Sequence, residues 1–110
     1  MAITIEPIRG VMVGSFGQTI TLIVVDEDGV VQDVSGYTDI TVISRSPYDL
    51  KTVTSSGSYT SDGTDGSITY SYVSGDIDRS GDWKVQAEFS TASETFKTRP
   101  TTMDVGMGLR

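Results

Sequence analysis

The feature that most constrains the fold is a strict alternation of apolar and polar residues in the last third of the chain. The apolar positions are Trp83, Val85, Ala87 and Phe89, and charged or amide side chains stand between them. A period of two is typical of an antiparallel strand that buries one face in a core. An acidic loop with two glycines, residues 74–82, precedes this strand. We expect Ile77 of the loop to enter the core and Ser80-Gly81 to reverse the chain.

The rest of the chain favours strands over helices. Apolar and polar residues also alternate in residues 18–25, 38–44 and 67–73, and turn sequences such as residues 26–29 separate these stretches. No window repeats apolar residues at helical spacing, and serine and threonine, which are poor helix formers, are abundant. These patterns predict an all-β fold, a single immunoglobulin-like antiparallel β-sandwich of about seven strands.

Composition excludes several kinds of chemistry. The chain has 110 residues, the usual size of one domain, and contains no cysteine and no histidine. Thiol nucleophiles, zinc-thiolate sites and histidine bases are therefore ruled out. The net charge of -7 opposes binding to a phosphate backbone. We expect no enzyme activity, no cofactor and no nucleic acid partner.

The charge is unevenly distributed along the sequence. No lysine or arginine lies between Arg9 and Arg45, and the acidic residues of that interval are Asp26, Glu27, Asp28, Asp33 and Asp39. We interpret this negative end as a solvated face. A pair of catalytic carboxylates is the alternative interpretation for residues 26–28, but a turn beside glycine offers neither of them an apolar pocket.

Both ends of the chain are apolar, so we divide it into an N-terminal arm or edge strand (residues 1–13), the sandwich (14–102) and a C-terminal tail (103–110). The terminal side chains expected to bind a partner are Ile3, Ile5, Ile8, Met12, Met103, Met107 and Leu109. Such arms can pair with a neighbour's sheet edge, or they can pair with each other as edge strands of one domain. The sequence leaves both alternatives open.

The N-terminus lacks the basic and apolar regions of a signal peptide, and no run of residues is as long and apolar as a membrane helix. We expect a soluble protein that is made in the cytoplasm and does not contact a membrane.

The run Asp76-x-Asp78-x-Ser80-Gly81-Asp82 resembles the first half of a calcium-binding loop. Its candidate metal ligands are Asp76, Asp78 and Asp82. The glutamate that completes such a loop is missing, because Ala87 stands at that position. We therefore favour the interpretation that these aspartates cap backbone N–H groups in a turn.

The aromatic residues fall into two groups. One group is a candidate carbohydrate platform and consists of Tyr70, Tyr72, Trp83 and Phe89. The alternation of apolar and polar residues places these four side chains on the inner face of the strands, so we favour a role in the core. The other group lies in or beside predicted loops and is our candidate for an exposed recognition surface: Tyr37, Tyr48 and Tyr59.

The order of these motifs resembles that of small immunoglobulin-like phage domains. The motifs are Gly17-Gln18-Thr19-Ile20-Thr21-Leu22, Asp26-Glu27-Asp28-Gly29, Asp33-Val34-Ser35-Gly36, Asp39-Ile40-Thr41-Val42, Gly66-Ser67-Ile68-Thr69-Tyr70 and Asp76-Ile77-Asp78-Arg79-Ser80-Gly81-Asp82-Trp83. Over residues 14–102 they are similar to the N-terminal domain family of the phage baseplate upper protein. The resemblance implies a virion component that joins other proteins through sheet edges and loops and has no catalytic residues.

Members of that family often carry a long C-terminal part that does not occur in this sequence, so roles in capsid decoration, neck, tail, baseplate or fibre attachment all stay open. We therefore predict a non-enzymatic structural protein located in the virion, with other virion proteins and copies of itself as partners. The alternative is an immunoglobulin-like adhesin module that binds a glycan or a host surface.

Overall fold

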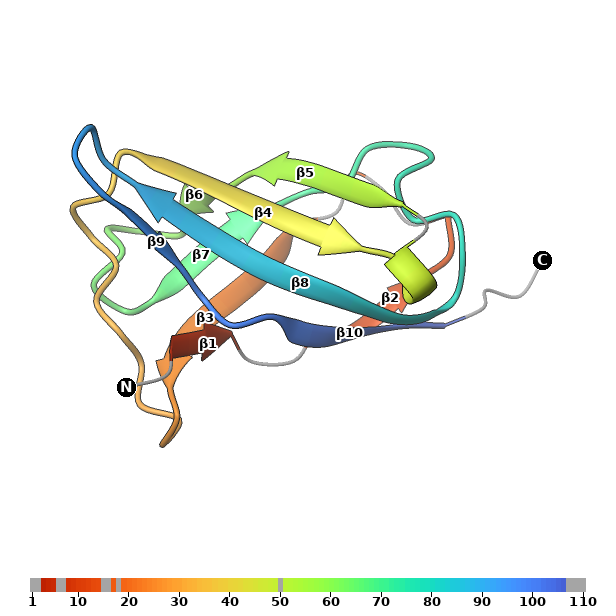
Figure 1. Ribbon diagram of the computed structural model, residues 1–110, viewed down its shortest axis with the longest axis horizontal. Coiled ribbons are helices and arrows are strands. Elements are labelled where there is room, and N and C mark those ends of the chain that lie inside the picture. Colours follow the sequence, from red (N-terminus) through yellow and green to blue (C-terminus); the bar gives the residue numbers. More distant parts are fainter. Residues whose placement is uncertain (1–2, 6–7, 15–16, 18, 50, 107–110) are drawn as a thin grey trace.

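The chain folds into two β-sheets that pack against each other as a sandwich (Figure 1). The computed structural model describes residues 3–5, 8–14, 17, 19–49 and 51–106. Within these residues the one helical element is η1 (Pro47–Asp49), a short 3-10 turn, and all other regular elements are strands. The all-β prediction is thereby confirmed.

The first sheet has four strands in the order β1-β3-β7-β6, all antiparallel to their neighbours. They are β1 (Ile3–Ile5), β3 (Ile20–Asp26), β7 (Ser67–Tyr70) and β6 (Ser58–Tyr59). At the end of β3 the predicted hairpin turn is present, because Gly29 has a φ of 80° and its N–H donates to the carbonyl of Asp26. The positive φ explains why glycine stands at this position.

The second sheet follows the order β2-β10-β8-β4-β5, with β9 also paired to β8. Its strands are β2 (Ile8–Met12), β10 (Thr101–Gly106), β8 (Gly81–Ser90), β4 (Asp39–Arg45), β5 (Thr52–Ser56) and β9 (Thr95–Lys97). The pairing of β2 with β10 is parallel. The prediction of purely antiparallel pairing is therefore wrong at this edge, because the N-terminal segment lies alongside the last strand of the chain in the same direction.

Both ends of the chain contribute strands to this one domain: β1 and β2 are edge strands, and β10 lies between β2 and β8. The segment β1 pairs with β3 in the first sheet, and β2 pairs with β10 in the second. The tail boundary predicted after residue 102 falls inside β10, where Met103 and Val105 are buried. Met103 therefore belongs to the core, because the alternation of apolar residues continues after Pro100.

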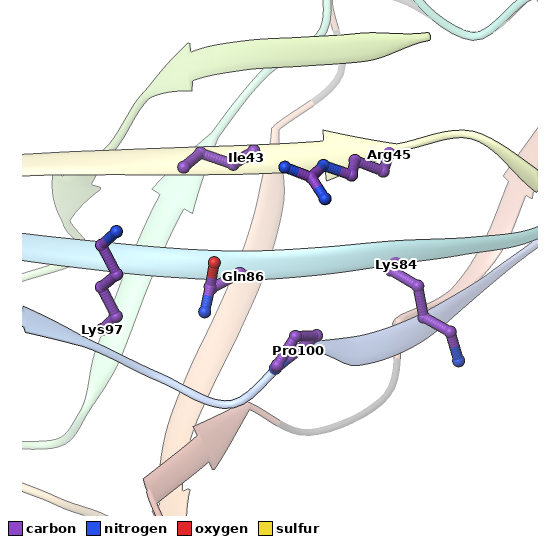
Figure 2. Close-up of a pocket in the computed structure, with 6 residues that line it drawn as sticks. All are labelled: Ile43, Arg45, Lys84, Gln86, Lys97 and Pro100. Carbon is purple, nitrogen blue, oxygen red and sulfur yellow. The ribbon is translucent and has the colours of Figure 1, made fainter. Parts of the chain in front are cut away.

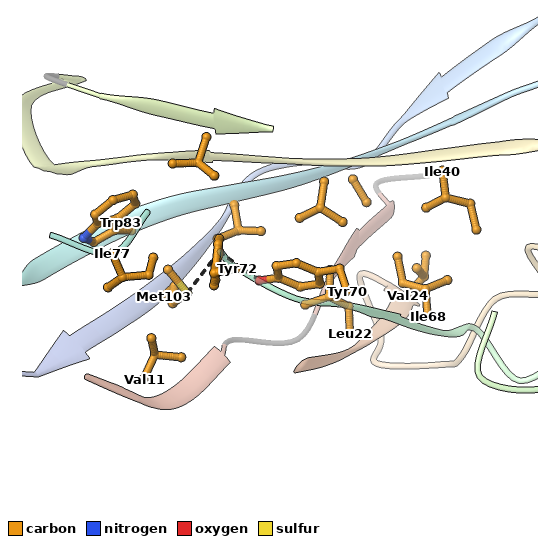
Figure 3. Packing of buried hydrophobic residues seen from close by; sticks show 14 of the residues in the cluster. Val11, Leu22, Val24, Ile40, Ile68, Tyr70, Tyr72, Ile77, Trp83 and Met103 are labelled. Atoms are coloured by element: carbon orange, nitrogen blue, oxygen red, sulfur yellow. Dashed lines mark hydrogen bonds between the residues drawn. The ribbon is translucent and has the colours of Figure 1, made fainter. Parts of the chain in front are cut away.

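The core lies between the sheets and contains the residues predicted from the alternation in β8. Trp83, Val85, Ala87 and Phe89 are all fully buried. Ile77, from the loop before this strand, is also buried, as predicted. Figure 3 shows Trp83 and Ile77 at one end of the cluster and Ile40 at the other. Burying the larger of these side chains contributes about 1.5 to 3 kcal/mol each to the stability of the fold.

Three buried hydroxyl groups form a chain across the core. The Tyr72 hydroxyl lies 2.7 Å from Ser44 Oγ and 3.0 Å from the Tyr70 hydroxyl, and it donates to Met103 Sδ at 3.6 Å (Figure 3). Because Tyr72 donates its one proton to sulfur, Ser44 and Tyr70 act as donors to its oxygen. Burial raises the pKa of both tyrosines, so the hydroxyls stay neutral.

The edge of β8 opposite β4 is covered by two separate strands. Residues 81–85 of β8 pair with β10, and residues 88–90 pair with β9. Between these two pairings, Thr98 takes the place of a regular strand partner of Ala87. Its N–H donates to the Ala87 carbonyl, and its Oγ1 accepts from the Ala87 N–H at 3.1 Å. Gln86 Nε2 donates to the Thr98 carbonyl at 2.7 Å. The irregular segment that follows, ending at Pro100, borders the hollow described next.

Candidate interaction surfaces

A positively charged hollow lies on the outer face of the second sheet (Figure 2). Its volume is about 430 Å³, and its walls come from β4, β8, β9 and the segment that joins β9 to β10. The lining residues are Ile43, Arg45, Lys84, Gln86, Lys97 and Pro100. Three of these six residues carry a positive charge, in a chain with only 8 basic residues and a net charge of -7.

Strand alternation and register bring these side chains together. Val85 and Ala87 point into the core, so Lys84 and Gln86 point outward. In the antiparallel pairing of β4 with β8, Arg45 lies opposite Lys84 and Ile43 lies opposite Gln86. Like charges directly opposite each other on neighbouring strands are destabilising. The register therefore places two basic residues opposite each other on this face.

The three cations of the hollow differ in their neighbours. Lys84 Nζ donates to the hydroxyl of Thr102 at 3.0 Å, and Lys97 Nζ lies 3.6 Å from Glu88 Oε2. The guanidinium of Arg45 has no hydrogen bond or ion pair with the described residues. Figure 2 shows the Arg45 guanidinium extending along β4 towards Ile43 and the Lys84 ammonium extending away from it. A guanidinium without a partner is a good binding group for a carboxylate or another anion. Ile43 and Pro100 add apolar wall to the same site.

The acidic interval of the sequence forms turns away from this hollow. Asp26 Oδ1 accepts hydrogen bonds from the N–H groups of Asp28 and Val30, so this carboxylate caps the hairpin turn. The side chains of Glu27 and Asp28 are exposed at its tip. Hydrogen bonds from the hydroxyl and N–H of Ser35 lower the pKa of Asp33. The geometry favours turn capping over paired catalytic carboxylates.

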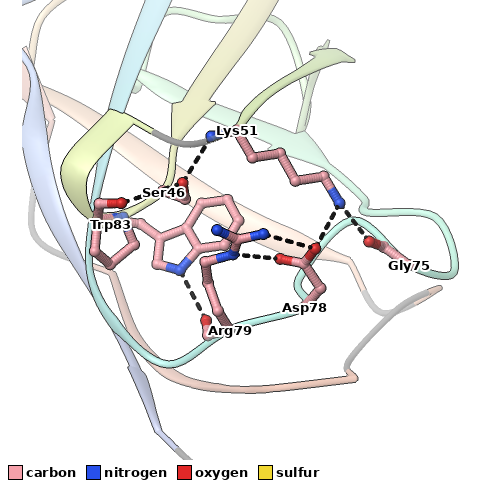
Figure 4. Close-up of polar contacts among 7 residues, drawn as sticks. Ser46, Lys51, Gly75, Asp78, Arg79 and Trp83 are labelled. Carbon is pink, nitrogen blue, oxygen red and sulfur yellow. Dashed lines mark hydrogen bonds and ion pairs between the residues drawn. The ribbon is translucent and has the colours of Figure 1, made fainter.

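Of the candidate metal ligands, Asp76 and Asp78 are engaged separately, and Asp82 is exposed on β8. Asp76 Oδ2 accepts a hydrogen bond from the Val73 N–H, as expected for turn capping. Asp78 contacts two cations, Arg79 Nε at 3.0 Å and Lys51 Nζ at 3.4 Å (Figure 4). Among the described residues, no group of three or more histidine, cysteine or acidic side chains is arranged to hold a metal ion.

The ion pairs of Asp78 join two loops next to the tryptophan. Lys51 Nζ also donates to the Gly75 carbonyl at 2.6 Å, and its backbone N–H donates to Ser46 Oγ (Figure 4). The indole N–H of Trp83 donates to the Arg79 carbonyl at 3.0 Å. The loop of residues 74–80 is therefore joined to the core through Trp83 and to the β4–β5 loop through Lys51.

The three loop tyrosines have different environments. Tyr48 is 91% exposed and adopts a φ of 62°, which is uncommon for a residue other than glycine. Tyr59 is partly buried, and its hydroxyl contacts the backbone of Val34 and Tyr37. Tyr37 packs against Phe89 and Phe96. Of the three, Tyr48 alone presents most of its ring to solvent.

The other predicted partner residues are also distributed unevenly. Met12 is 47% exposed at the end of β2, whereas Met103 is buried. Ile3, Ile5 and Ile8 lie in edge strands, but their side chains are outside the described part of the structure. Met107 and Leu109 lie outside the described residues altogether. A carbohydrate platform of Tyr70, Tyr72, Trp83 and Phe89 is excluded because all four are buried.

The hollow itself was not predicted. The alternation in β8 does place Lys84 and Gln86 on the outer face, which was available from the sequence. The juxtaposition with Arg45 depends on the register of β4 against β8, which the pattern alone does not give.

No protein-family model matches this sequence, and no curated protein matches it. Within the described residues, no helix is long and apolar enough to cross a membrane.

Proposed function

We propose that this chain is a non-enzymatic structural component of a phage virion, an immunoglobulin-like sandwich that joins neighbouring proteins through sheet edges, terminal strands and loops. The capsid surface, neck, tail and baseplate are all compatible sites for such a component. Other virion proteins and copies of the chain itself are its proposed partners.

The strand order supports the immunoglobulin-like assignment. Immunoglobulin sandwiches place their first, second, fifth and fourth strands in one sheet and their third, sixth and seventh in the other. Here the sheet β1-β3-β7-β6 matches the first set, and β4, β8 and β10 match the second when β2, β5 and β9 are taken as additions. One difference is the position of the tryptophan, which lies on β8 instead of the strand that corresponds to β4.

The observation that carries the assembly role is the open edge at β5. Among the described strands, β5 pairs only with β4. Its sequence, Thr-Val-Thr-Ser-Ser, has no charged residue and no proline. Natural proteins usually protect free edges with lysine, proline or a bulge. An unprotected edge supports pairing with a strand of a partner.

The exposed Tyr48 ring adds to this edge, because η1 lies in the loop between β4 and β5. A left-handed backbone at a bulky residue carries strain, and such strain is concentrated at functional sites. Large aromatic rings are also enriched among the residues that dominate protein interfaces. We therefore propose Tyr48 and β5 as one partner contact of the chain.

A second candidate function, binding of a glycan or host surface, is favoured by the same ring, because aromatic rings and their hydroxyls form interfaces with amphipathic ligands. The distinguishing variant is Tyr48→Ala. If it abolishes retention on a glycan array that retains the unaltered protein, the adhesin alternative is supported. The matched variant Tyr59→Phe keeps a partly buried ring and should leave such retention unchanged.

The test of the main proposal is co-purification with particles. The phage that carries the gene is grown on its host, and the lysate is fractionated on a density gradient. An antibody then detects the chain in each fraction. Recovery in the particle fraction, resistant to a salt wash, is the expected result. Recovery only in the soluble fraction would contradict the proposal.

A further inference from the structure

We propose that the positively charged hollow of one copy binds the acidic hairpin tip of a second copy, so that the chain associates head to tail. The hairpin tip consists of residues 27–31. This inference rests on the proposed assembly function, because it names one partner, the chain itself, and the surface that binds it.

The lining of the hollow favours an anionic occupant, because three of its six residues are basic. Arg45 and Lys84 lie opposite each other in the β4–β8 pairing, and the Arg45 guanidinium has no partner among the described residues. An anionic occupant would neutralise this like-charge pair. Local rules of stability are broken most often where a protein has a function to perform.

The hairpin tip offers the matching chemistry. Glu27 and Asp28 are exposed, and their carboxylates form no bond with the described residues. Val30 is 56% exposed and Val31 is 51% exposed, one glycine after these acids. The tip therefore combines two free carboxylates with two exposed apolar side chains, and the hollow combines three cations with the apolar surfaces of Ile43 and Pro100.

The tip is held rigidly in its conformation. The Asp26 carboxylate accepts hydrogen bonds from the N–H groups of Asp28 at 2.9 Å and Val30 at 3.0 Å. Val25 forms an isolated bridge with Val31, which closes the base of the turn. A segment that is already ordered loses little entropy when it binds.

The two surfaces belong to opposite sheets of one chain. The tip follows β3 of the first sheet and projects beyond the body of the sandwich, whereas the hollow lies over β4 and β8 of the second (Figures 1 and 2). A tip therefore meets the hollow of another copy. Because the contact joins two different surfaces, repetition generates a ring or a filament.

Charge on the whole molecule does not prevent this contact. Two copies with net charges of -7 repel each other, but at about 0.15 M salt this long-range term is screened beyond about 8 Å. Attraction between the hollow and the tip acts at contact distance and is screened less. Association is therefore expected near physiological salt and should weaken at about 1 M salt, where the screening length is about 3 Å.

Matched charge variants test the proposal by sedimentation velocity of the full chain at about 100 μM, where a micromolar contact is populated. The tip variant is Glu27→Lys with Asp28→Asn, and the hollow variant is Arg45→Glu with Lys84→Gln. A control with the same charge change as the tip variant, Glu94→Lys with Asp39→Asn, alters exposed acids outside both surfaces. Circular dichroism melting establishes that each variant is folded.

The wild type and the control should sediment as oligomers, and each variant alone should be a monomer. An equimolar mixture of the two variants should form a complex that stops at two chains, because only one intact tip and one intact hollow remain. Val30→Ser, which leaves every charge in place, should weaken association by about tenfold or less, as for loss of apolar contact.

A monomeric wild type would overturn the proposal without bearing on recovery of the chain in particles. A tip variant that still associates would show that the tip is not needed for self-association, and a hollow variant that still associates would show the same for the hollow. Either result would also overturn it.

Discussion

Arg45 and Lys84 lie directly opposite each other on the outer face of the second sheet, in the antiparallel register of β4 with β8. The substitution Arg45→Glu replaces this like-charge pair by an ion pair. We expect it to raise the free energy of unfolding by about 0.2 to 1 kcal/mol, at the low end because both side chains are exposed. Urea denaturation measures the change. The substitution Lys97→Glu does the reverse, because it places a second acid opposite Glu88, and it should lower the free energy of unfolding. Equal effects of the two substitutions on stability would contradict this interpretation.

Trp83 fills the end of the core and also donates its indole N–H to the Arg79 carbonyl. Truncation by Trp83→Ala should lower the free energy of unfolding by about 3 to 5 kcal/mol. The control Tyr48→Ala removes a ring that is 91% exposed and should change stability by less than about 0.5 kcal/mol. A Trp83→Ala variant of full stability would place this residue outside the core.

The hydroxyl of Tyr72 connects Ser44, Tyr70 and Met103 inside the core. Tyr72→Phe leaves the hydroxyls of Ser44 and Tyr70 buried without this partner, at a cost of about 1 to 3 kcal/mol. Adding Ser44→Ala should recover part of the loss, because one of the stranded groups is then removed. Chemical denaturation of the single and double variants measures both effects. If the double variant is less stable than Tyr72→Phe, the two hydroxyls do not act as a pair.

The carboxylate of Asp78 makes stability depend on pH in the acidic range. Hydrogen bonds from Arg79, and next from Lys51, lower the pKa of Asp78 to about 2. Because its pKa in the folded state is below the ordinary value of 3.8, the unfolded chain binds the proton first. The stabilisation is therefore complete above about pH 4 and is lost as the pH falls towards 2.

The matched measurement follows the melting temperature of the wild type and of Asp78→Asn across this range. Asp33 and Asp62, whose pKa values are also lowered by hydrogen bonds, titrate in both proteins. The difference between the two melting curves should therefore shrink between pH 4 and pH 2. A difference that is constant with pH would show that Asp78 does not stabilise the fold through its charge.

Alanine substitutions at two glycines with positive φ distinguish the cost of backbone strain from the cost of steric crowding around an added Cβ. Gly29 has a φ of 80° and open space where a Cβ would be added, so Gly29→Ala should cost about 1 to 2 kcal/mol from conformation alone. Gly66 has a φ of 71°, and an added Cβ would lie 2.8 Å from the carbonyl oxygens of Gln32 and Val24. Gly66→Ala should cost clearly more, and equal losses in melting temperature would contradict this comparison.

Much of the fold could be predicted because alternation is a local property. The inward positions of β8, the buried Ile77 and the hairpin at Gly29 all follow from side-chain period and turn chemistry. The parallel pairing of β2 with β10 could not, because it joins residues about a hundred positions apart and depends on which edge is left open.

The candidate sites were less predictable, because exposure depends on tertiary packing. Tyr37, Tyr48 and Tyr59 look alike in the sequence, yet only Tyr48 is strongly exposed, since the rings of the other two pack against or bond to neighbouring segments. The hollow required the register of Arg45 against Lys84 and the break between β9 and β10 at Thr98, and neither has a local sequence signal.

The central claim is that the chain is a repeated structural part of a virion, and quantitative mass spectrometry of gradient-purified particles tests it most directly. Peptides of the chain should be present at a fixed number of copies relative to the major capsid protein, and at several copies or more per particle, as symmetric assembly requires. Their absence from particles that contain capsid and tail proteins in normal amounts would contradict the claim.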